Sequence, residues 1–280
     1  MIENKDIEKS LRKKFHDQIF TKFCKAINDF ELILPNDKIA VCISGGKDSM
    51  LLAKLFQELK RHNKIPFEVV YLAMDPGYNK QNRQLIESNA KQMEIPITIF
   101  ETKIFESVTN IPKYPCYICA RMRRGNLYAK AKELGCNKIA LGHHFDDIIE
   151  TTLMSMLYGG QIETMMPKLH SENFDGMELI RPLYYVRERD IEHWRDYNQL
   201  QFLQCACRFT ERAKDNENLS KRKVIKRLIN ELAKENPQVE KSIFKSTQNV
   251  NLAKILEFKD RYGIRHNFLD EYDKDDKGGN

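Results

Sequence analysis

Short apolar runs alternate with longer amphipathic stretches through the first half of the chain. Apolar runs of the length of buried strands lie at residues 39–43, 67–74, 97–100 and 138–141. Helical patterns separate and follow them at residues 48–60, 81–93, 121–134 and 146–157. Strands and helices that alternate in this way predict a parallel sheet with helices on both faces, so the expected fold class is α/β.

The two ends of the chain show helical patterns without strands. Near the start, apolar residues recur every four positions at Ile7, Leu11, Phe15, Ile19, Phe23 and Ile27, which predicts an amphipathic helix that packs on the domain or on another subunit. Later helical patterns lie at 190–198, 219–234 and 238–258. We therefore expect an N-terminal helical segment (1–30), a central α/β domain (31–200), a C-terminal helical segment (201–262) and a charged, disordered tail (263–280).

Composition narrows the function classes. The 280 residues carry a net charge of +6, but 46 basic residues are interleaved with 40 acidic ones, so charge alone does not indicate a nucleic-acid partner. The sequence shows no apolar stretch of membrane-spanning length and no signal-peptide pattern, so we expect a cytoplasmic protein with no membrane contact. Seven cysteines in such a chain favour reduced thiols, metal ligation or catalysis over a disulfide framework.

A glycine-containing loop follows the first predicted strand and precedes the first helix of the α/β pattern. It consists of Ser44, Gly45, Gly46, Lys47, Asp48 and Ser49. Paired glycines let the backbone approach an anion closely, and the first N–H groups of a helix have no internal partner. A nucleotide phosphate satisfies them, and an acid at Asp48 fits there if a divalent cation lies between it and the phosphate. A simple strand-to-helix turn is the alternative.

This hexapeptide resembles the S-G-G-x-D-S loop of the PP-loop ATP pyrophosphatases, whose fold is Rossmann-like and which split ATP between its α- and β-phosphates. The resemblance implies that residues 31–200 form the ATP-binding domain. It also places the end of the strand at 67–74 against adenine, with Met74 as the contact; core packing is the alternative for Met74.

Another strand end carries the sequence Gly142-His143-His144-Phe145-Asp146-Asp147. Gly142 permits close approach to a nucleotide, and Asp146 and Asp147 near a helix start could hold Mg²⁺ or orient the ribose. A His-His pair is more often a capping or packing feature than a catalytic one. Farther along, Arg181 follows an apolar pair and could face the phosphates as a fixed cation, with a surface salt bridge as the alternative.

A C-x-x-C motif opens the helical pattern that contains three arginines. Its cysteines are Cys116 and Cys119, and the arginines are Arg121, Arg123 and Arg124. Thiolates near a helix N-terminus and guanidinium groups have lowered pKa values, which suits metal ligands or nucleophiles. A redox disulfide, half a zinc site and part of an iron–sulfur site remain possible interpretations. Further thiols lie at Cys205 and Cys207, whereas Cys24, Cys42 and Cys136 are interpreted as small buried residues.

Five motifs together resemble the tRNA 2-thiocytidine synthetase family in order and spacing, over about Ile7 to Leu232. They are S-G-G-K-D-S, C-x-x-C-x-R-x-R-R-G-x-L-Y, L-G-H-H-x-D-D, Met-Leu-Tyr-Gly-Gly at 156–160 and Arg-Pro-Leu at 181–183. The resemblance implies an enzyme that adenylylates the C2 oxygen of an anticodon-loop cytidine. Sulfur delivered through a [4Fe–4S] cluster then replaces AMP, with ATP, Mg²⁺ and a sulfur donor such as a cysteine desulfurase.

Carried over by position, the resemblance assigns ATP to the loop 44–49, Gly142, His143 and Asp147, and two cluster ligands to Cys116 and Cys119. The segment that should supply the third ligand departs from the family pattern, since it reads Gln204-Cys205-Ala206-Cys207. We favour Cys207 and keep Cys205 as the alternative.

The family also implies a tRNA partner and a homodimer. Basic residues at 121–124 and at Lys221, Arg222, Lys223, Lys226 and Arg227 are candidate RNA contacts, although the second group also fits a solvated helix face. The alternative function is a PP-loop sulfur transferase or another adenylylating enzyme that acts on a different tRNA base or on a small molecule.

Overall fold

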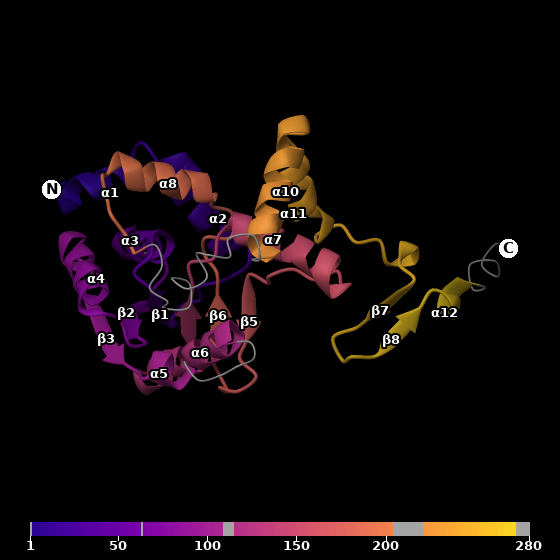
Figure 1. Ribbon diagram of the computed structural model, residues 1–280, viewed down its shortest axis with the longest axis horizontal. Helices are drawn as coiled ribbons and strands as arrows, with labels where there is room; N and C mark the ends of the chain where they lie inside the picture. Colours follow the sequence, from indigo (N-terminus) through magenta and orange to yellow (C-terminus); the bar gives the residue numbers. More distant parts are fainter. Residues whose placement is uncertain (1, 63, 109–114, 204–220, 273–280) are drawn as a thin grey trace.

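The computed structural model describes residues 2–62, 64–108, 115–203 and 221–272. Its centre is a six-stranded sheet in the order β3-β2-β1-β4-β6-β5 (Figure 1). The strands are β1 (Lys38–Ile43), β2 (Glu68–Asp75), β3 (Ile97–Glu101), β4 (Lys138–Ala140), β5 (Lys168–His170) and β6 (Glu178–Ile180). All neighbours pair in parallel except β5, which is antiparallel to β6 at the edge. The α/β fold class is confirmed.

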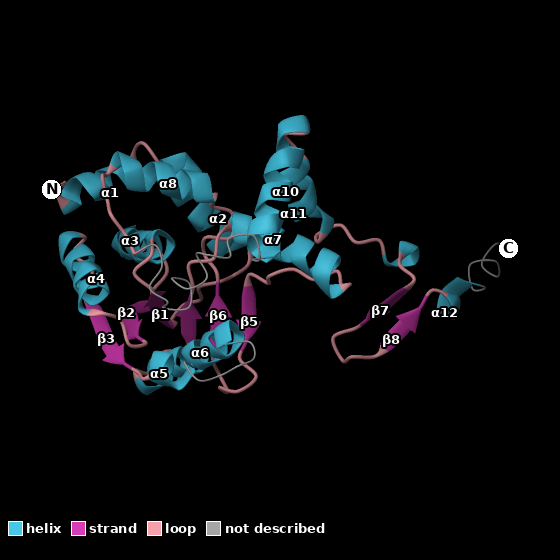
Figure 2. Cartoon of the chain, viewed as in Figure 1, coloured by secondary structure: helices cyan, strands magenta, loops and turns pink. Residues whose placement is uncertain are grey.

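Helices cover both faces of this sheet (Figures 1 and 2). One layer contains α3 (Lys47–His62), α4 (Lys80–Gln92) and α8 (Glu188–Tyr197), and the other contains α5 (Ile104–Val108) and α6 (Pro115–Glu133). Successive side chains of β1 point to opposite faces, because strands have a period of two. Val41 therefore joins the core under α3, whereas Cys42 joins the core under α6. Both faces of β1 are buried, which explains its continuous apolar run.

The N-terminal apolar pattern forms three helical pieces instead of one helix. They are α1 (Asn4–Arg12), a π-helical turn η1 (His16–Phe20) and α2 (Thr21–Asp29). The apolar side chains expected on one face, from Ile7 to Ile27, are all buried in the core shared with α3 and α8. The N-terminal segment therefore packs on its own domain.

The C-terminal part differs from the expected helices and tail. The helices α10 (Lys221–Glu235) and α11 (Val239–Ser246) pack on α7 (Phe145–Met154), which continues into a π-helical turn η2 (Ser155–Gly159). Beyond them lie a 3₁₀ turn η4 (Leu252–Lys254), the strands β7 (Glu257–Lys259) and β8 (Arg265–Asn267), and α12 (Leu269–Tyr272). A helix was expected up to residue 258, but β7 begins at Glu257, and β8 lies within the stretch expected to be disordered from 263. Residues 273–280 of that expected tail lie outside the described residues.

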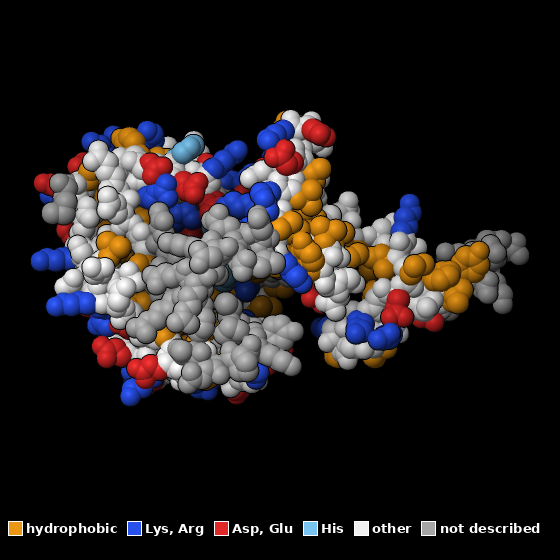
Figure 3. Space-filling view, viewed as in Figure 1, with side chains coloured by type: hydrophobic (Ala, Val, Ile, Leu, Met, Phe, Trp, Pro, Cys, Tyr) orange, Lys and Arg blue, Asp and Glu red, His pale blue; other side chains and the backbone are white. Residues whose placement is uncertain are grey.

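The β7–β8 hairpin stands off the body of the molecule (Figure 1). Hydrophobic side chains are exposed along it and at the foot of α10 (Figure 3). Among the described helices, none combines the length and the apolar character that crossing a bilayer requires.

Candidate functional site

The loop 44–49 joins β1 to α3 at the carboxyl edge of the sheet, where open α/β sheets bind ligands. The Ser49 hydroxyl accepts a hydrogen bond from the Ser44 backbone N–H at 3.1 Å and donates one to the Gly46 carbonyl at 3.0 Å. Gly45 has φ +85°, and a Cβ there would lie 2.6 Å from Ile86 Cγ1. The loop therefore requires glycine at 45, and Ser49 holds its shape from inside.

Lys47 lies between two acidic side chains. Its Nζ is 3.0 Å from Glu188 Oε1 on α8 and 3.3 Å from Asp48 Oδ1. Burial alone would lower the pKa of Lys47, but the charges of Asp48 and Glu188 outweigh it and raise the pKa. Burial likewise opposes ionisation of Glu188, yet Lys226 and Lys47 lower its pKa to about 2. Lys47 is therefore a firmly charged cation at the loop.

The strand end after β4 lies directly against this loop. A Cβ on Gly142 would be 3.1 Å from the Asp48 carbonyl carbon and the Ser49 nitrogen, so glycine permits the two segments to meet. At the start of α7, Asp147 Oδ2 accepts the His144 backbone N–H at 3.1 Å. Burial lowers the pKa of His143 to about 4, with Arg181 adding to the effect, so its imidazole is neutral at pH 7.

Two carboxylates approach the same imidazole nitrogen. His144 Nε2 is 3.9 Å from Asp48 Oδ1 and 3.5 Å from Asp147 Oδ2. Burial raises the pKa of Asp48 despite the opposing charges of His144 and Lys47. Asp48 Oδ1 is shielded from solvent and accepts no hydrogen bond from a described residue, with Lys47 as its ion-pair partner at 3.3 Å. A buried carboxylate oxygen without a donor, beside a second carboxylate, fits a hard divalent cation such as Mg²⁺. The donor set of Asp48 and Asp147 therefore suits the expected ion.

Asp146 has a different role from its neighbour. Its carboxylate accepts hydrogen bonds from Arg187 Nη2 at 3.1 Å and from the Glu188 backbone N–H at 2.7 Å. It therefore caps the first turn of α8 and ties α8 to the start of α7. The geometry assigns Asp146 to support of the site, in place of the Mg²⁺ or ribose contact considered from the sequence.

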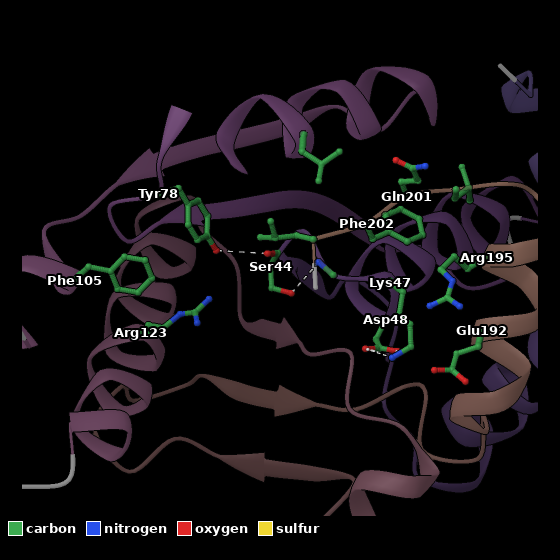
Figure 4. Close-up of a pocket in the computed structure, with 14 residues that line it drawn as sticks. Ser44, Lys47, Asp48, Tyr78, Phe105, Arg123, Glu192, Arg195, Gln201 and Phe202 are labelled. Carbon is green, nitrogen blue, oxygen red and sulfur yellow. Dashed lines mark hydrogen bonds and ion pairs between the residues drawn. The ribbon is translucent and has the colours of Figure 1, made fainter. Parts of the chain in front are cut away.

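Two cavities meet at the loop and share Ser44, Asp48 and Arg123. The smaller cavity, of about 510 Å³, lies over β1 and β4; its other lining residues include Ser49, Met74, Gly142, His143, Asp147 and Arg181. The larger cavity, of about 910 Å³, lies toward α8; its other lining residues include Gly46, Lys47, Tyr78, Phe105, Glu192, Arg195 and Phe202 (Figure 4). The residues expected to bind ATP are thus gathered around the smaller cavity and the loop.

Met74 and Arg181 each line the smaller cavity. Met74 is also buried in a core cluster with Phe105 and Cys119, so its core packing is confirmed, and its contact with adenine stays a prediction. Arg181 is 6% exposed, donates to the Met166 carbonyl and forms no salt bridge with a described residue. Burial lowers its pKa to about 10, which leaves it charged at pH 7. The surface salt bridge considered for Arg181 is therefore wrong.

The C-x-x-C motif lies at the first turn of α6, with positions 116 and 119 one turn apart. The Cys119 side chain is buried beside Met74, and Arg123 one turn later lines both cavities. Two cysteine positions one turn apart at a helix start suit thiolate ligands. Cys205 and Cys207 lie outside the described residues, within which no set of three His, Cys, Asp or Glu forms a metal site. By contrast, burial raises the pKa of Cys42 to about 12 and also raises that of Cys136.

Two residues of the second basic group, considered from the sequence as RNA contacts or a solvated helix face, form ion pairs with acidic residues of the site. Arg222 Nη1 donates to Asp147 Oδ1 at 2.6 Å, and Lys226 Nζ donates to Glu188 Oε2 at 2.5 Å. Both basic residues belong to α10, so this part of the second basic group reaches the site, although the Arg222 and Lys226 side chains remain 42% and 49% exposed. The i, i+4 spacing of Arg222 and Lys226 on an amphipathic helix indicates that they share one face. It does not identify their acidic partners, because these come from α7 and α8.

Comparisons with known proteins agree with this geometry. Residues 15–231 match the model of the PP-loop domain family. The chain is 37% identical over 255 residues to a tRNA-cytidine(32) 2-sulfurtransferase of Neisseria meningitidis serogroup C, which covers 89% of this chain and 74% of the relative. It is 36% identical over 249 residues to the protein of the same name from Syntrophotalea carbinolica, which covers 86% of this chain and 93% of the relative.

A solved structure has a similar fold. It is the U34-tRNA thiolase NcsA from Methanococcus maripaludis with its [4Fe–4S] cluster, at a TM-score of 0.63 and 22% sequence identity. The alignment covers 81% of this chain and 76% of that chain. At this level of identity the similarity concerns the fold.

Proposed function

The chain belongs to the tRNA-cytidine(32) 2-sulfurtransferase family of PP-loop proteins, and from that membership we propose that it converts cytidine 32 of tRNA into 2-thiocytidine with ATP, releasing AMP and pyrophosphate. The observation that supports it most strongly is the meeting of two cavities at Asp48 and the loop 44–49. An enzyme that adenylylates one nucleotide with another needs two adjoining binding spaces with phosphate groups between them.

The first step activates the C2 oxygen. That oxygen attacks the α-phosphorus of ATP, the bond from the α-phosphorus to the bridging oxygen breaks, and pyrophosphate leaves with the bonding electrons. The backbone amides of the loop and Lys47 stabilise the charge that gathers on pyrophosphate. Lys47 leaves Glu188 or shares its hydrogens to do so, since its Nζ is 3.0 Å from that carboxylate before substrate arrives.

Mg²⁺ at Asp48 and Asp147 would neutralise phosphate charge. Arg181 supplies a further fixed cation at the smaller cavity, and the neutral imidazole of His143 offers a hydrogen bond without adding charge. Glycine at 142 leaves room for a nucleotide close to the backbone of Asp48. The adenosine half of ATP is thereby oriented over β1 and β4.

The second step replaces oxygen by sulfur. A sulfide-level nucleophile attacks C2 of the activated base, and the C2–O bond breaks so that AMP leaves with the oxygen. We propose that Cys116, Cys119 and Cys207, with Cys205 as the alternative, would hold a [4Fe–4S] cluster, which would supply the sulfur-transfer chemistry when bound. The burial of Cys119 beside Met74 keeps this end of α6 close to the nucleotide cavity.

Partners follow from the same chemistry. The tRNA supplies the cytidine, and a cysteine desulfurase or another persulfide donor supplies sulfur at the sulfane level. A two-electron reductant, such as a pair of thiols that ends as a disulfide, brings that sulfur to the sulfide level. We also propose that the protein is a homodimer and works in the cytoplasm. Light scattering of the purified protein tests the dimer, because one chain has a mass of 33.0 kDa and a particle of that mass in solution would contradict it.

The test of the function is tRNA-dependent AMP release together with detection of 2-thiocytidine, on protein purified without oxygen. Cys119→Ala should abolish thiolation while ATP binding persists, and the matched variant Cys136→Ala, which removes a buried thiol from another core, should retain it. Iron and sulfide analysis of Cys205→Ala beside Cys207→Ala identifies the third ligand. AMP release without tRNA, or with a different modified base, would favour the alternative of a PP-loop enzyme with another acceptor.

A further inference from the structure

The larger cavity has the chemistry of a nucleobase site. Tyr78, Phe105 and Phe202 line it, and the Tyr78 and Phe105 rings meet edge to face with centroids 6.0 Å apart. Unstacked RNA bases are bound by stacking on aromatic side chains, with hydrogen bonds to their Watson–Crick edges. The cavity joins the loop at Ser44 and Asp48, so a base bound in it lies next to the phosphates.

One face of α8 borders this cavity. Glu188, Glu192 and Arg195 are spaced i, i+4 and i+7, so they share that face. Glu188 binds Lys47 at 3.0 Å, which places this end of the row at the loop, and Glu192 and Arg195 continue along the cavity wall (Figure 4).

The side chains of this row have hydrogen-bonding capacity left for a ligand. Among the described residues, Glu192 forms no hydrogen bond and no salt bridge, and Arg195 uses its Nε on Asp196 at 2.7 Å. A carboxylate acceptor thus lies one helical turn from a guanidinium donor, on a cavity wall that also carries aromatic and aliphatic side chains.

The proposed reaction leaves a problem of selectivity that this pair can solve. Cytosine and uracil share the C2 carbonyl that is activated, so chemistry at C2 does not distinguish them. They differ at C4, where cytosine carries an amino donor and uracil a carbonyl acceptor, and N3 is an acceptor in cytosine and a donor in uracil. Carboxylates accept from the cytosine amino group.

We propose that Glu192 and Arg195 read the Watson–Crick edge of the target cytosine, Glu192 accepting from the C4 amino group and Arg195 donating to N3. The inference rests on the proposed function and adds the residues that choose the base. A uracil in the same position would set its C4 oxygen against the carboxylate and its N3–H against the guanidinium. Each unmatched pair leaves polar groups without partners in the cavity.

The experiment compares two tRNA transcripts that differ only by cytidine or uridine at the target position, with AMP release as the readout. Wild type should prefer cytidine. Glu192→Gln should lower the ratio of kcat/KM for cytidine over uridine by about tenfold to a hundredfold, because an amide can accept from one base or donate to the other. A residue that only supported the fold would lower both rates and leave the ratio unchanged.

Matched variants keep the result decisive. Glu133→Gln makes the same change on a side chain 65% exposed at the far end of α6 and should leave the ratio unchanged. Glu192→Asp, which retains the carboxylate, should keep the preference for cytidine at a lower rate. It replaces Glu192→Gln as the test variant if the glutamine variant does not fold. A Glu192→Gln ratio within twofold of wild type overturns the base-reading role while the function stands. Wild type that releases no AMP with either transcript overturns both.

Discussion

At the scale of single residues, the site depends on polar groups whose charge or missing hydrogen bond lowers the stability of the fold. The Asp48 side chain is 28% exposed, but one of its carboxylate oxygens is shielded from solvent and accepts no hydrogen bond from a described residue, and partial burial raises its pKa. Such an arrangement weakens the fold unless a ligand compensates for it. Asp48 is therefore better explained by nucleotide and cation binding than by stability.

Asp48→Asn tests that explanation. We expect tRNA-dependent AMP release to fall by at least about a hundredfold, because the neutral asparagine amide no longer holds the divalent cation at the phosphates. The melting temperature should stay equal to wild type or rise, since the raised pKa of Asp48 means that its ionised form costs stability in the folded protein. Isothermal titration with Mg²⁺ and a non-hydrolysable ATP analogue separates loss of binding from loss of chemistry. Full activity of the variant would contradict the assignment.

Gly142→Ala tests the contact between the two strand ends. The new Cβ would lie 3.1 Å from backbone atoms of Asp48 and Ser49, so the loop must move and ATP affinity should fall by about tenfold or more. Gly125→Ala is the matched control, because nothing lies within 4 Å of its Cβ and the residue is inside α6. The control should bind ATP normally and gain up to about 1 kcal/mol of stability. Equal ATP affinities for the two variants would count against the close contact.

Some site residues could be predicted from the sequence and others could not, for a physical reason. The loop 44–49 and Gly142 follow strands closely, Asp147 lies in the first turn of the next helix, and local sequence brings them to one sheet edge. Glu188 and Arg222 act through partners on other elements, which no local pattern specifies. Burial of Arg181 likewise depends on how the chain packs around it, so its surface interpretation failed.

At the scale of elements, buried charge fixes the N-terminal helices. Lys54 of α3 is 1% exposed and contacts Glu8 of α1 at 3.0 Å, and Arg61 also donates to Glu8. Burial alone would raise the pKa of Glu8, but Arg61 and Lys54 outweigh it and lower the pKa to about 2. Burial lowers the pKa of Lys54. The ion pair of Glu8 and Lys54 therefore holds α1 against α3 at a place that is shielded from solvent.

Glu8→Gln should lower the free energy of unfolding at pH 7 by about 3–5 kcal/mol, because Lys54 loses its charged partner. Since the folded pKa of Glu8 lies below the unfolded value of 4.5, its contribution is complete above pH 4.5 and disappears as pH falls through about 2. Denaturant titrations at pH 7 and at pH 2.5 measure this, and the difference between variant and wild type should shrink at the lower pH. Glu3→Gln, on an exposed residue, is the control. An equal difference at both pH values would disprove the ionic origin.

Long elements were more predictable than short ones. The strands β1 and β2 and the helices α3, α4 and α8 lie within a few residues of the expected ranges, because each repeats its period over several positions. The strands β5, β6, β7 and β8 have three residues each and show no period. The π-helical turns within the N-terminal pattern and after α7 keep the apolar side chains inward, so the pattern alone does not reveal them.

At the scale of the whole molecule, the described cores end before the C-terminal hairpin. Phe244 is the last buried hydrophobic residue among the described residues, whereas Leu256, Tyr262 and Leu269 are exposed. The α/β centre, the N-terminal helices and the pair α10 and α11 share these cores, so they are expected to unfold together.

A chain that ends after residue 249 should consequently keep its melting temperature within about 2 °C of the full chain. Differential scanning calorimetry measures it, and tRNA-dependent AMP release shows whether the hairpin serves the reaction. A chain that ends after residue 235 is the contrasting variant, because it removes α11 and the buried Phe244, and it should melt several degrees lower. A large drop on removal of the hairpin alone would show that it contributes to the cores.

The wall that the two cavities share at Ser44, Asp48 and Arg123 also has a pharmacological consequence. An adenosine fragment in one space and a pyrimidine fragment in the other would end within a short linker of each other. If the two fragments are joined, binding of the first gives the second an effective concentration in the millimolar range. Two weak ligands would therefore give one tight inhibitor. Such a bisubstrate compound would be selective for enzymes that place a base reader on α8 beside a phosphate loop.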